Sequence, residues 1–221
     1  MAFITKLNQL DIAGWRLLGC GNALRPTLSF RKSSLMQIEA TRKRFTVDDY
    51  HRMAEAGILT ETDRVELIEG EIVEMSPIGD RHAMAVNRAT MIFTRGIGDQ
   101  AVVSIQNAAH IDRYNEPQPD VVLIRPREGF YGTRHPRPED VVLLIEVSDT
   151  TLRFDRSVKL PIYARSGICE VWIVDLINNA IHVHREPTGR SYAVIGTKGR
   201  GESISVQAFP KFEIKVDDLL G

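Results

Sequence analysis

The chain of 221 residues is poor in cysteine and contains no long apolar run. Its two cysteines, Cys20 and Cys169, lie far apart without CxxC spacing, which argues against a disulfide framework and against a structural zinc site built on cysteine. A membrane helix needs about 20 apolar residues, and Asp, Arg or Lys interrupts every candidate stretch. We therefore expect a protein of the reducing cytoplasm without a membrane span.

The chain also lacks the excess of basic residues that is typical of proteins with a broad nucleic-acid surface. Residues 1–35 hold five Lys or Arg and one Asp, a net charge of +4, and the whole chain carries −1, so the rest carries −5. Because phosphate neutralisation supplies most non-specific affinity, any DNA contact must be local. The candidate is a basic loop with a single acid, Glu128; the alternative is a solvated loop. Its cationic residues are Arg125, Arg127, Arg134, His135 and Arg137.

Regular patterns begin only after Met36. Residues 1–35 show neither helical periodicity nor strand alternation, so we expect them to lie outside the fold as a disordered or wrongly assigned extension, with Met36 as the true start. A hydrophobic content of 43% and a charged content of 26% are typical of a soluble globular protein. The remainder, 36–221, is predicted to be a single domain.

Periodicity within this domain predicts helices around a central sheet. Thr46 and Asp49 form a capping-box pattern before a short helix that ends at Gly57, and alternation around Gly70 predicts a hairpin of residues 64–69 and 71–75. A second helix is expected from Asp80 to Gly96 or Gly98 and a third over 155–166. Strands are expected at 102–106, 120–125, 141–147, 171–176, 180–185, 192–195 and 203–206.

Two carboxylates accompany the most apolar of these strands. Asp120 opens the run 121–124, and Glu146 lies near the end of the run 141–147. A bare ionised carboxylate inside a buried strand costs several kcal/mol unless a cation compensates it. A divalent metal ion held by both acids would supply that charge. The plainer interpretation is that Asp120 caps its strand after Pro119 and that Glu146 pairs with an arginine.

Lys159 is the third candidate. In the predicted helix Asp155, Lys159 and Tyr163 are spaced four apart and share one face. A fixed, partly desolvated ammonium can orient the attacking water or stabilise charge in phosphodiester hydrolysis. The alternative is a surface ion pair between Lys159 and Asp155. Tyr163 is assigned to the core, with no catalytic role.

Three further side chains are weaker candidates. Glu66 would project from the hairpin toward a metal, although a hairpin Glu often faces solvent. His82, in the first turn of its helix, would contact a phosphate or polarise water, or would be an ordinary helix-start histidine. Gln106 would offer its amide to the same cleft.

Taken in order, these motifs resemble a known family. The segments 65–71, 75–77 with His82, 118–120, 145–149 and 155–159, and the run 163–175, are similar to the Uma-two family of restriction endonucleases in the PD-(D/E)XK nuclease superfamily. The similarity spans roughly residues 45–220. Ser148 stands where the superfamily pattern has its lysine, which leaves Lys159 as the evident substitute.

The resemblance implies an α/β fold: a restriction-endonuclease-like core whose central mixed β-sheet is flanked by helices, with an N-terminal helix and hairpin and a C-terminal β extension. It implies a metal-dependent endodeoxyribonuclease with Mg²⁺ or Mn²⁺ on Asp120 and Glu146, and with Lys159, Glu66 and His82 in the catalytic set. It also implies DNA as substrate and a homodimer. The competing hypothesis is a non-catalytic adaptor that keeps the nuclease scaffold and binds nucleic acid or protein.

Overall fold

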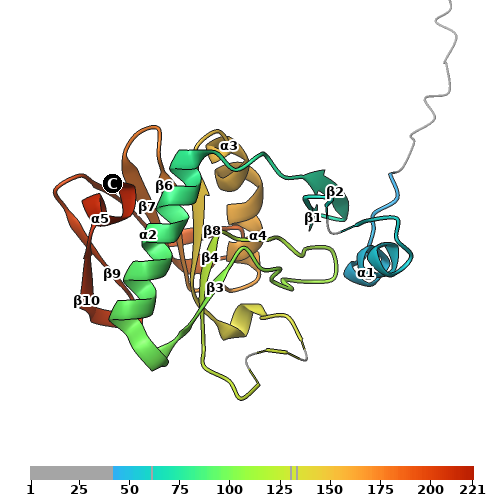
Figure 1. The fold of residues 1–221 in the computed structure, drawn as a ribbon, viewed down its shortest axis with the longest axis horizontal. Coiled ribbons are helices and arrows are strands. Elements are labelled where there is room, and N and C mark those ends of the chain that lie inside the picture. Colours follow the sequence, from blue (N-terminus) through green and yellow to red (C-terminus); the bar gives the residue numbers. More distant parts are fainter. Residues whose placement is uncertain (1–41, 61, 130, 133) are drawn as a thin grey trace, which may run out of the picture. The chain divides into compact units, whose positions relative to one another are not determined.

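A mixed six-stranded sheet is the central element of the fold (Figure 1). The computed structural model describes residues 42–221 except 61, 130 and 133, so the predictions for residues 1–35 and for a start at Met36 lie outside the described residues. The strand order is β3-β4-β5-β6-β7-β8. The strands are β3 (Val102–Ile105), β4 (Val121–Ile124), β5 (Val141–Ser148), β6 (Glu170–Asp175), β7 (Ala180–Thr188) and β8 (Ser191–Gly199).

Within this sheet β5 and β6 run parallel, and the other neighbouring pairs run antiparallel. All residues of β4 and β6 are buried, as their continuous apolar runs predict, because both faces of the sheet are covered. Alternate residues serve the two faces: Val121 and Leu123 belong to one hydrophobic cluster, and Val122 and Ile124 to the other.

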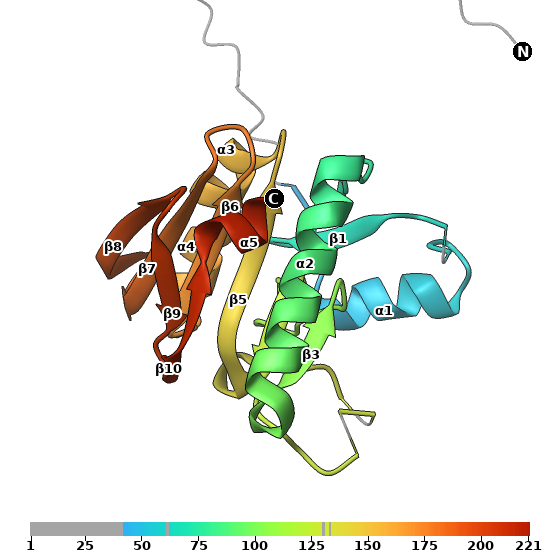
Figure 2. The same cartoon turned by 60° about the vertical axis from the view of Figure 1, so that its left-hand side comes forward.

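Helix α2 (Asp80–Ile97) covers the first face together with α5 (Val216–Leu220), as Figures 1 and 2 show. Helix α4 (Leu160–Arg165) covers the second face, where Ile162 and Tyr163 pack on Leu144 and Val171. The C-terminal extension is a separate two-stranded sheet of β9 (Ser203–Val206) and β10 (Phe209–Lys215). The sequence patterns did not predict β10 or α5.

The first elements form as their local signals predict. Helix α1 (Val47–Glu55) begins with a capping box, in which the Asp49 N–H donates to Thr46 Oγ1 and the Thr46 N–H donates to Asp49 Oδ2. Strands β1 (Val65–Ile68) and β2 (Glu71–Glu74) pair through a turn in which Glu69 and Gly70 have φ angles of +50° and +79°. A Cβ at Gly70 would lie 2.8 Å from Arg44 Cβ, so the turn requires glycine.

The structure has helical backbone over the predicted residues 155–166, but it is not one regular α-helix. The chain forms a short α3 (Leu152–Phe154), then one π-helical turn η3 (Asp155–Lys159), then α4. Pro161 has no N–H for the carbonyl of Ser157, and its ring crowds that carbonyl, which accounts for the wider turn. Lys159 and Asp155 are both buried in this turn.

Two 3₁₀ turns complete the described elements, η1 (Gly98–Gln100) and η2 (Pro138–Asp140). Among the described residues, no helix combines the length and the apolar character needed to cross a lipid bilayer.

A substitution at Gly96, in α2, tests whether β10 packs against this helix. A Cβ at Gly96 would lie 1.9 Å from Phe212 Cε2, and Phe212 in turn makes an edge contact with Phe93. Gly→Ala inside a helix normally stabilises by about 1 kcal/mol, but the overlap here reverses the sign. We expect Gly96→Ala to lower the free energy of unfolding by about 1–2 kcal/mol in urea denaturation.

The matched control is Gly196→Ala in β8, where an added Cβ has no heavy atom within 4 Å. This variant should keep the stability of the parent. A Gly96→Ala protein at least as stable as the parent would show that Phe212 does not pack on α2.

Candidate active site

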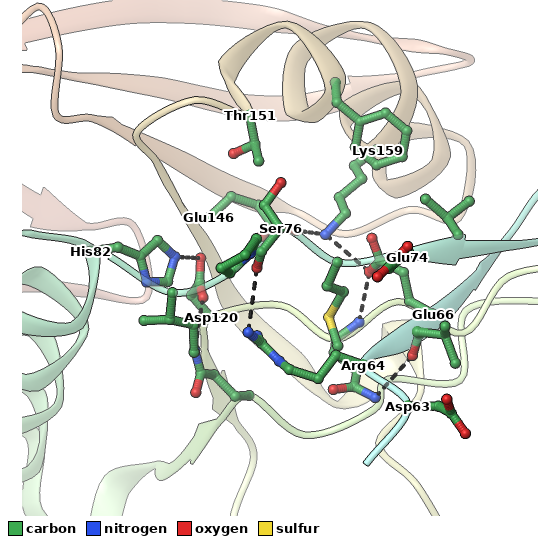
Figure 3. A pocket seen from close by; sticks show the side chains of 18 of the residues that line it. Asp63, Arg64, Glu66, Glu74, Ser76, His82, Asp120, Glu146, Thr151 and Lys159 are labelled. Atoms are coloured by element: carbon green, nitrogen blue, oxygen red, sulfur yellow. Dashed lines mark hydrogen bonds and ion pairs between the residues drawn. The ribbon is translucent and has the colours of Figure 1, made fainter. Parts of the chain in front are cut away.

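Strand register brings the two predicted carboxylates together. Val121 pairs with Ile145 across β4 and β5, so one residue further along Asp120 comes opposite Glu146. Both side chains line a cavity of about 1290 Å³ between the hairpin, the N-terminal turn of α2 and the turn that contains Lys159 (Figure 3). Asp120 is 9% exposed and Glu146 is 4% exposed.

Asp120 is held from three directions. The Val147 N–H donates to Asp120 Oδ2 at 2.8 Å, His82 Nε2 lies 3.1 Å from the same oxygen, and Gln106 Nε2 donates to Oδ1 at 3.3 Å. Gln106 has a φ angle of +49°, and its backbone N–H donates to the Asp120 carbonyl at 3.1 Å. This left-handed turn directs its amide at Asp120, and such strained residues concentrate at functional sites.

Lys159 joins two carboxylates that come from different elements. Its ammonium lies 3.0 Å from Glu66 Oε2, on β1, and 3.3 Å from Glu146 Oε1, on β5 (Figure 3). Lys159 is 6% exposed and Glu66 is 3% exposed. The backbone N–H of Gln118 also donates to Glu66 Oε2, at 3.2 Å. The lysine therefore acts as the charged link between hairpin and sheet.

The surroundings shift the proton affinities of this pair. Burial raises the pKa of Glu146 well above its ordinary value; Lys159 opposes the shift, and Asp155, Asp120 and Glu66 reinforce it. Burial alone would lower the pKa of Lys159, but the carboxylates of Glu146 and Glu66 raise it above its ordinary value. Lys159 thus stays protonated at neutral pH, whereas burial and the neighbouring acids disfavour the ionised form of Glu146.

Ser148 and Asp155 form a second layer beside this cluster. Ser148 Oγ and Thr151 Oγ1 each donate to Asp155 Oδ2 at 2.7 Å. Burial raises the pKa of Asp155, and Lys159 opposes this shift. Ser148, at the end of β5, therefore fixes a carboxylate of the π-helical turn.

The charged side chains that line the cavity are mostly acidic. They are Asp63, Glu66, Glu74, Asp120, Glu146, Asp149 and Asp155, against Arg64 and Lys159, with His82 beside them. A site of this sign repels a phosphate group and attracts a small cation. Its oxygen-rich donor set matches the preference of Mg²⁺ and Mn²⁺, so Asp120 and Glu146 fit as metal ligands.

The structure thus brings all five predicted side chains into one cavity: Asp120, Glu146, Lys159, Glu66 and His82. Their catalytic roles stay predictions. Two of the plainer interpretations are wrong, since Glu66 is not exposed to solvent and Lys159 forms its ion pairs with Glu66 and Glu146 instead of a surface pair with Asp155.

Tyr163 is the residue that sequence reasoning missed. It is a core residue, as predicted, at 1% exposed, but its hydroxyl donates to Glu146 Oε1 at 2.5 Å. Burial raises the pKa of Tyr163 well above its ordinary value, and Glu146 adds to the shift, so the hydroxyl keeps its proton. The spacing of Asp155, Lys159 and Tyr163 on one helix face was the available signal.

The basic loop lies apart from the cavity. Asp120 precedes β4 at one end, and residues 125–137 follow β4 at the other, about 13 Å along the strand. None of the described residues of this loop lines the cavity, and Arg134 is paired with Asp140 at 2.7 Å. A single phosphate group in the cavity therefore has no contact with the loop.

Comparisons with known proteins agree with this fold. Residues 47–217 match the family model Uma2, described as "Putative restriction endonuclease". A similar solved structure is that of a putative nuclease belonging to DUF820 from Anabaena variabilis ATCC 29413, with 16% identity, a TM-score of 0.62, and coverage of 80% of this chain and 97% of that one. At that identity the likeness shows the fold alone, and the predicted restriction-endonuclease-like fold is confirmed. No curated protein matches the chain.

The His82–Asp120 contact predicts a pH dependence of stability. Burial lowers the pKa of His82, but the contact with Asp120 raises it by more than burial lowers it. The pKa of His82 therefore lies above the ordinary value of 6.5. A raised histidine pKa stabilises the fold below the unfolded-state pKa, and this stabilisation is lost as pH rises through the folded-state pKa. In chelator, the difference in Tm between the parent and His82→Asn should be largest below pH 6.5 and should shrink above it.

Thermal unfolding of both proteins from about pH 5.5 to about pH 8.5 measures this difference around the ordinary histidine pKa. A gap in Tm that stays constant, or that widens with pH, would contradict a protonated His82 on Asp120.

Proposed function

The chain belongs to the Uma2 family of putative restriction endonucleases, and we propose on this premise that it is a metal-dependent endonuclease that hydrolyses DNA phosphodiester bonds. The observation that supports the proposal most is the meeting of Asp120 and Glu146 on adjacent strands with a buried Lys159 beside them. The cavity that contains them is lined by seven acidic side chains against one arginine and one lysine.

Asp120 and Glu146 are the residues that would hold Mg²⁺ or Mn²⁺. Hard divalent cations take carboxylate oxygens, and an ion held here would supply Lewis-acid stabilisation of the negative charge on the scissile phosphate. His82, Gln106 and the Val147 N–H fix the orientation of Asp120, and Tyr163 fixes Glu146. Both carboxylates are therefore preorganised before any ligand binds.

Lys159 serves as a fixed cation in this mechanism. Its raised pKa keeps the proton on Nζ, so the side chain orients the attacking water and stabilises developing charge without removing a proton. Glu66, 3.0 Å from Nζ, positions this ammonium from the hairpin. The π turn holds Lys159 on the same side of the helix as Asp155 and Tyr163, and π turns are frequent at functional sites.

The substrate class follows from family and charge together. An acidic cavity accepts a phosphodiester only after a cation has reversed its local sign, so DNA binding should depend on the metal. Concerted cleavage of both strands would use two such sites, which the two subunits of a homodimer would supply. The basic loop would contact DNA outside the cavity.

A non-catalytic adaptor is the second candidate. Ser148 at the lysine position of the nuclease pattern and the net acidic cavity favour it. Titration calorimetry with Mg²⁺ or Mn²⁺ separates the two hypotheses. A metal-dependent nuclease shows a heat of binding that the Asp120→Asn variant loses. An adaptor without a working site shows no such heat.

Cleavage of supercoiled and linear DNA in Mg²⁺ or Mn²⁺ tests the main proposal. We expect Asp120→Asn, Glu146→Gln and Lys159→Met each to lower the cleavage rate at least about 100-fold, the size of loss seen when a charge-stabilising group is removed. Glu202→Gln is the control: this exposed acid pairs with Lys198, lies outside the cavity, and should leave the rate unchanged. If all four variants cleaved DNA at the rate of the parent protein, the proposal would be refuted.

Tyr163 allows a finer test within the same cavity. Tyr163→Phe keeps the buried ring but removes the hydrogen bond to Glu146, and loss of such a bond to a charged group corresponds to about a tenfold lower kcat. The matched control is Tyr192→Phe, which removes another buried hydroxyl, a donor to the Ile168 carbonyl at 3.0 Å.

Both tyrosine variants should lose similar stability in thermal unfolding, but only Tyr163→Phe should lose activity. A parallel loss in both would mean that the Tyr163 hydroxyl affects the rate through folding alone.

A further inference from the structure

Three histidines gather around one buried glutamate outside the cavity. His51 is on α1, His110 and Glu116 are in the segment between β3 and β4, and His135 is in the segment between β4 and β5. The whole chain has six histidines, so half of them meet here from three separate segments. None of these four residues lines the cavity that contains Asp120 and Glu146.

The donor atoms are close to one another. His51 Nε2 lies 2.7 Å from Glu116 Oε1, and the rings of His51 and His135 are 5.9 Å apart between centroids. One donor atom from each of His51, Glu116 and His135 lies within 4.8 Å of the other two. His110 Nδ1 lies 3.6 Å from the second carboxylate oxygen, Glu116 Oε2.

Glu116 lacks the partners that a buried carboxylate normally has. It is 2% exposed, and its Oε2 is buried without a hydrogen-bond donor among the described residues. Its ion pairs within the described part of the chain are with His51 and His110, and none is with Lys or Arg. A buried carboxylate without a compensating partner is costly, so a cation bound beside Glu116 would offset this cost.

We propose that His51, Glu116 and His135 bind a divalent transition-metal ion of the zinc class. Imidazole nitrogen with one carboxylate is a ligand set that suits Zn²⁺, with bonds of about 2.0–2.1 Å, and three protein ligands leave a fourth position for water. In a tetrahedral site such donors are about 3.3 Å apart, so the observed spacing requires small movements only. His51 and His135 reach solvent and are free to make them.

The histidine cluster and the cavity differ in the ligand atoms that they offer to a metal ion. The cavity offers carboxylate oxygens, which suit Mg²⁺, whereas this cluster offers two or three imidazoles, which Mg²⁺ does not favour. The two sites should therefore select different ions in the same protein.

Glu116 is hydrogen-bonded through its backbone to strand β1, so an ion bound to its side chain would be connected to that strand. The Glu116 N–H donates to the Leu67 carbonyl at 2.8 Å, and the Leu67 N–H donates to the Glu116 carbonyl at 3.4 Å. Leu67 directly follows Glu66, the partner of Lys159. A bound ion would thus fasten α1 and the segment of His135 to the strand that carries Glu66.

Zinc retention by the full-length chain tests the proposal. Protein stripped with chelator is loaded with Zn²⁺, dialysed, and assayed for metal by mass spectrometry; thermal unfolding is measured with Zn²⁺ and with Mg²⁺. The parent should retain one Zn²⁺ per chain, with a Tm increase of roughly 5–10 °C at a hundredfold excess over Kd. His135→Ala, an exposed position, should bind Zn²⁺ at least about tenfold more weakly.

Two controls identify the ligands. Asp120→Asn removes a carboxylate of the cavity, and His182→Ala removes a histidine that contacts Asp175 and Thr197 instead of Glu116. Both should retain zinc like the parent. The proposal is overturned if the parent retains no zinc, if His135→Ala retains as much as His182→Ala, or if Asp120→Asn alone loses the ion.

Discussion

The ion pairs of Lys159 with Glu66 and Glu146 are the interaction on which the rest of the site depends. One buried ammonium joins the hairpin to the central sheet, and each of the three groups is nearly inaccessible to water. Removing one partner of a buried ion pair leaves an uncompensated charge, which typically costs about 3–5 kcal/mol. The hairpin is therefore held at the cavity by the same charges that are proposed to act there.

This arrangement leaves the site short of positive charge. Glu66, Glu146 and Asp155 act on one lysine, and burial raises the pKa of Glu146, a shift that Asp155, Asp120 and Glu66 reinforce. A divalent cation bound to Asp120 and Glu146, as proposed, would balance the acidic side chains of this cavity. The backbone and side-chain donors on Asp120 are already in place, so the proposed ion would not have to order this carboxylate on binding.

The sequence predicted the parts of this site that depend on strand and helix periodicity. Continuous apolar runs identified β4 and β5, and their register made neighbours of Asp120 and Glu146. The capping box at Thr46 and the turn at Gly70 are local signals, and both predictions are confirmed.

Other features depend on packing between distant segments, which local patterns do not encode. For Lys159 the sequence left two interpretations open, a catalytic ammonium and a surface ion pair with Asp155. Its pairing with Glu66 could not be predicted, because the approach of Glu66 depends on how the hairpin docks on the sheet. The contact of the Tyr163 hydroxyl with Glu146 likewise joins α4 to β5, and it depends on how the helix packs on the sheet. The cluster around Glu116 joins residues from three segments and has no short motif.

The most direct test of the central claim is the anomalous X-ray difference density of crystals soaked in Mn²⁺. We expect a peak within coordination distance of both Asp120 and Glu146, about 2.0–2.3 Å from one oxygen of each. We also expect the peak to be absent in crystals of the Asp120→Asn variant. Density for the ion elsewhere, with these two carboxylates unligated, would contradict this claim.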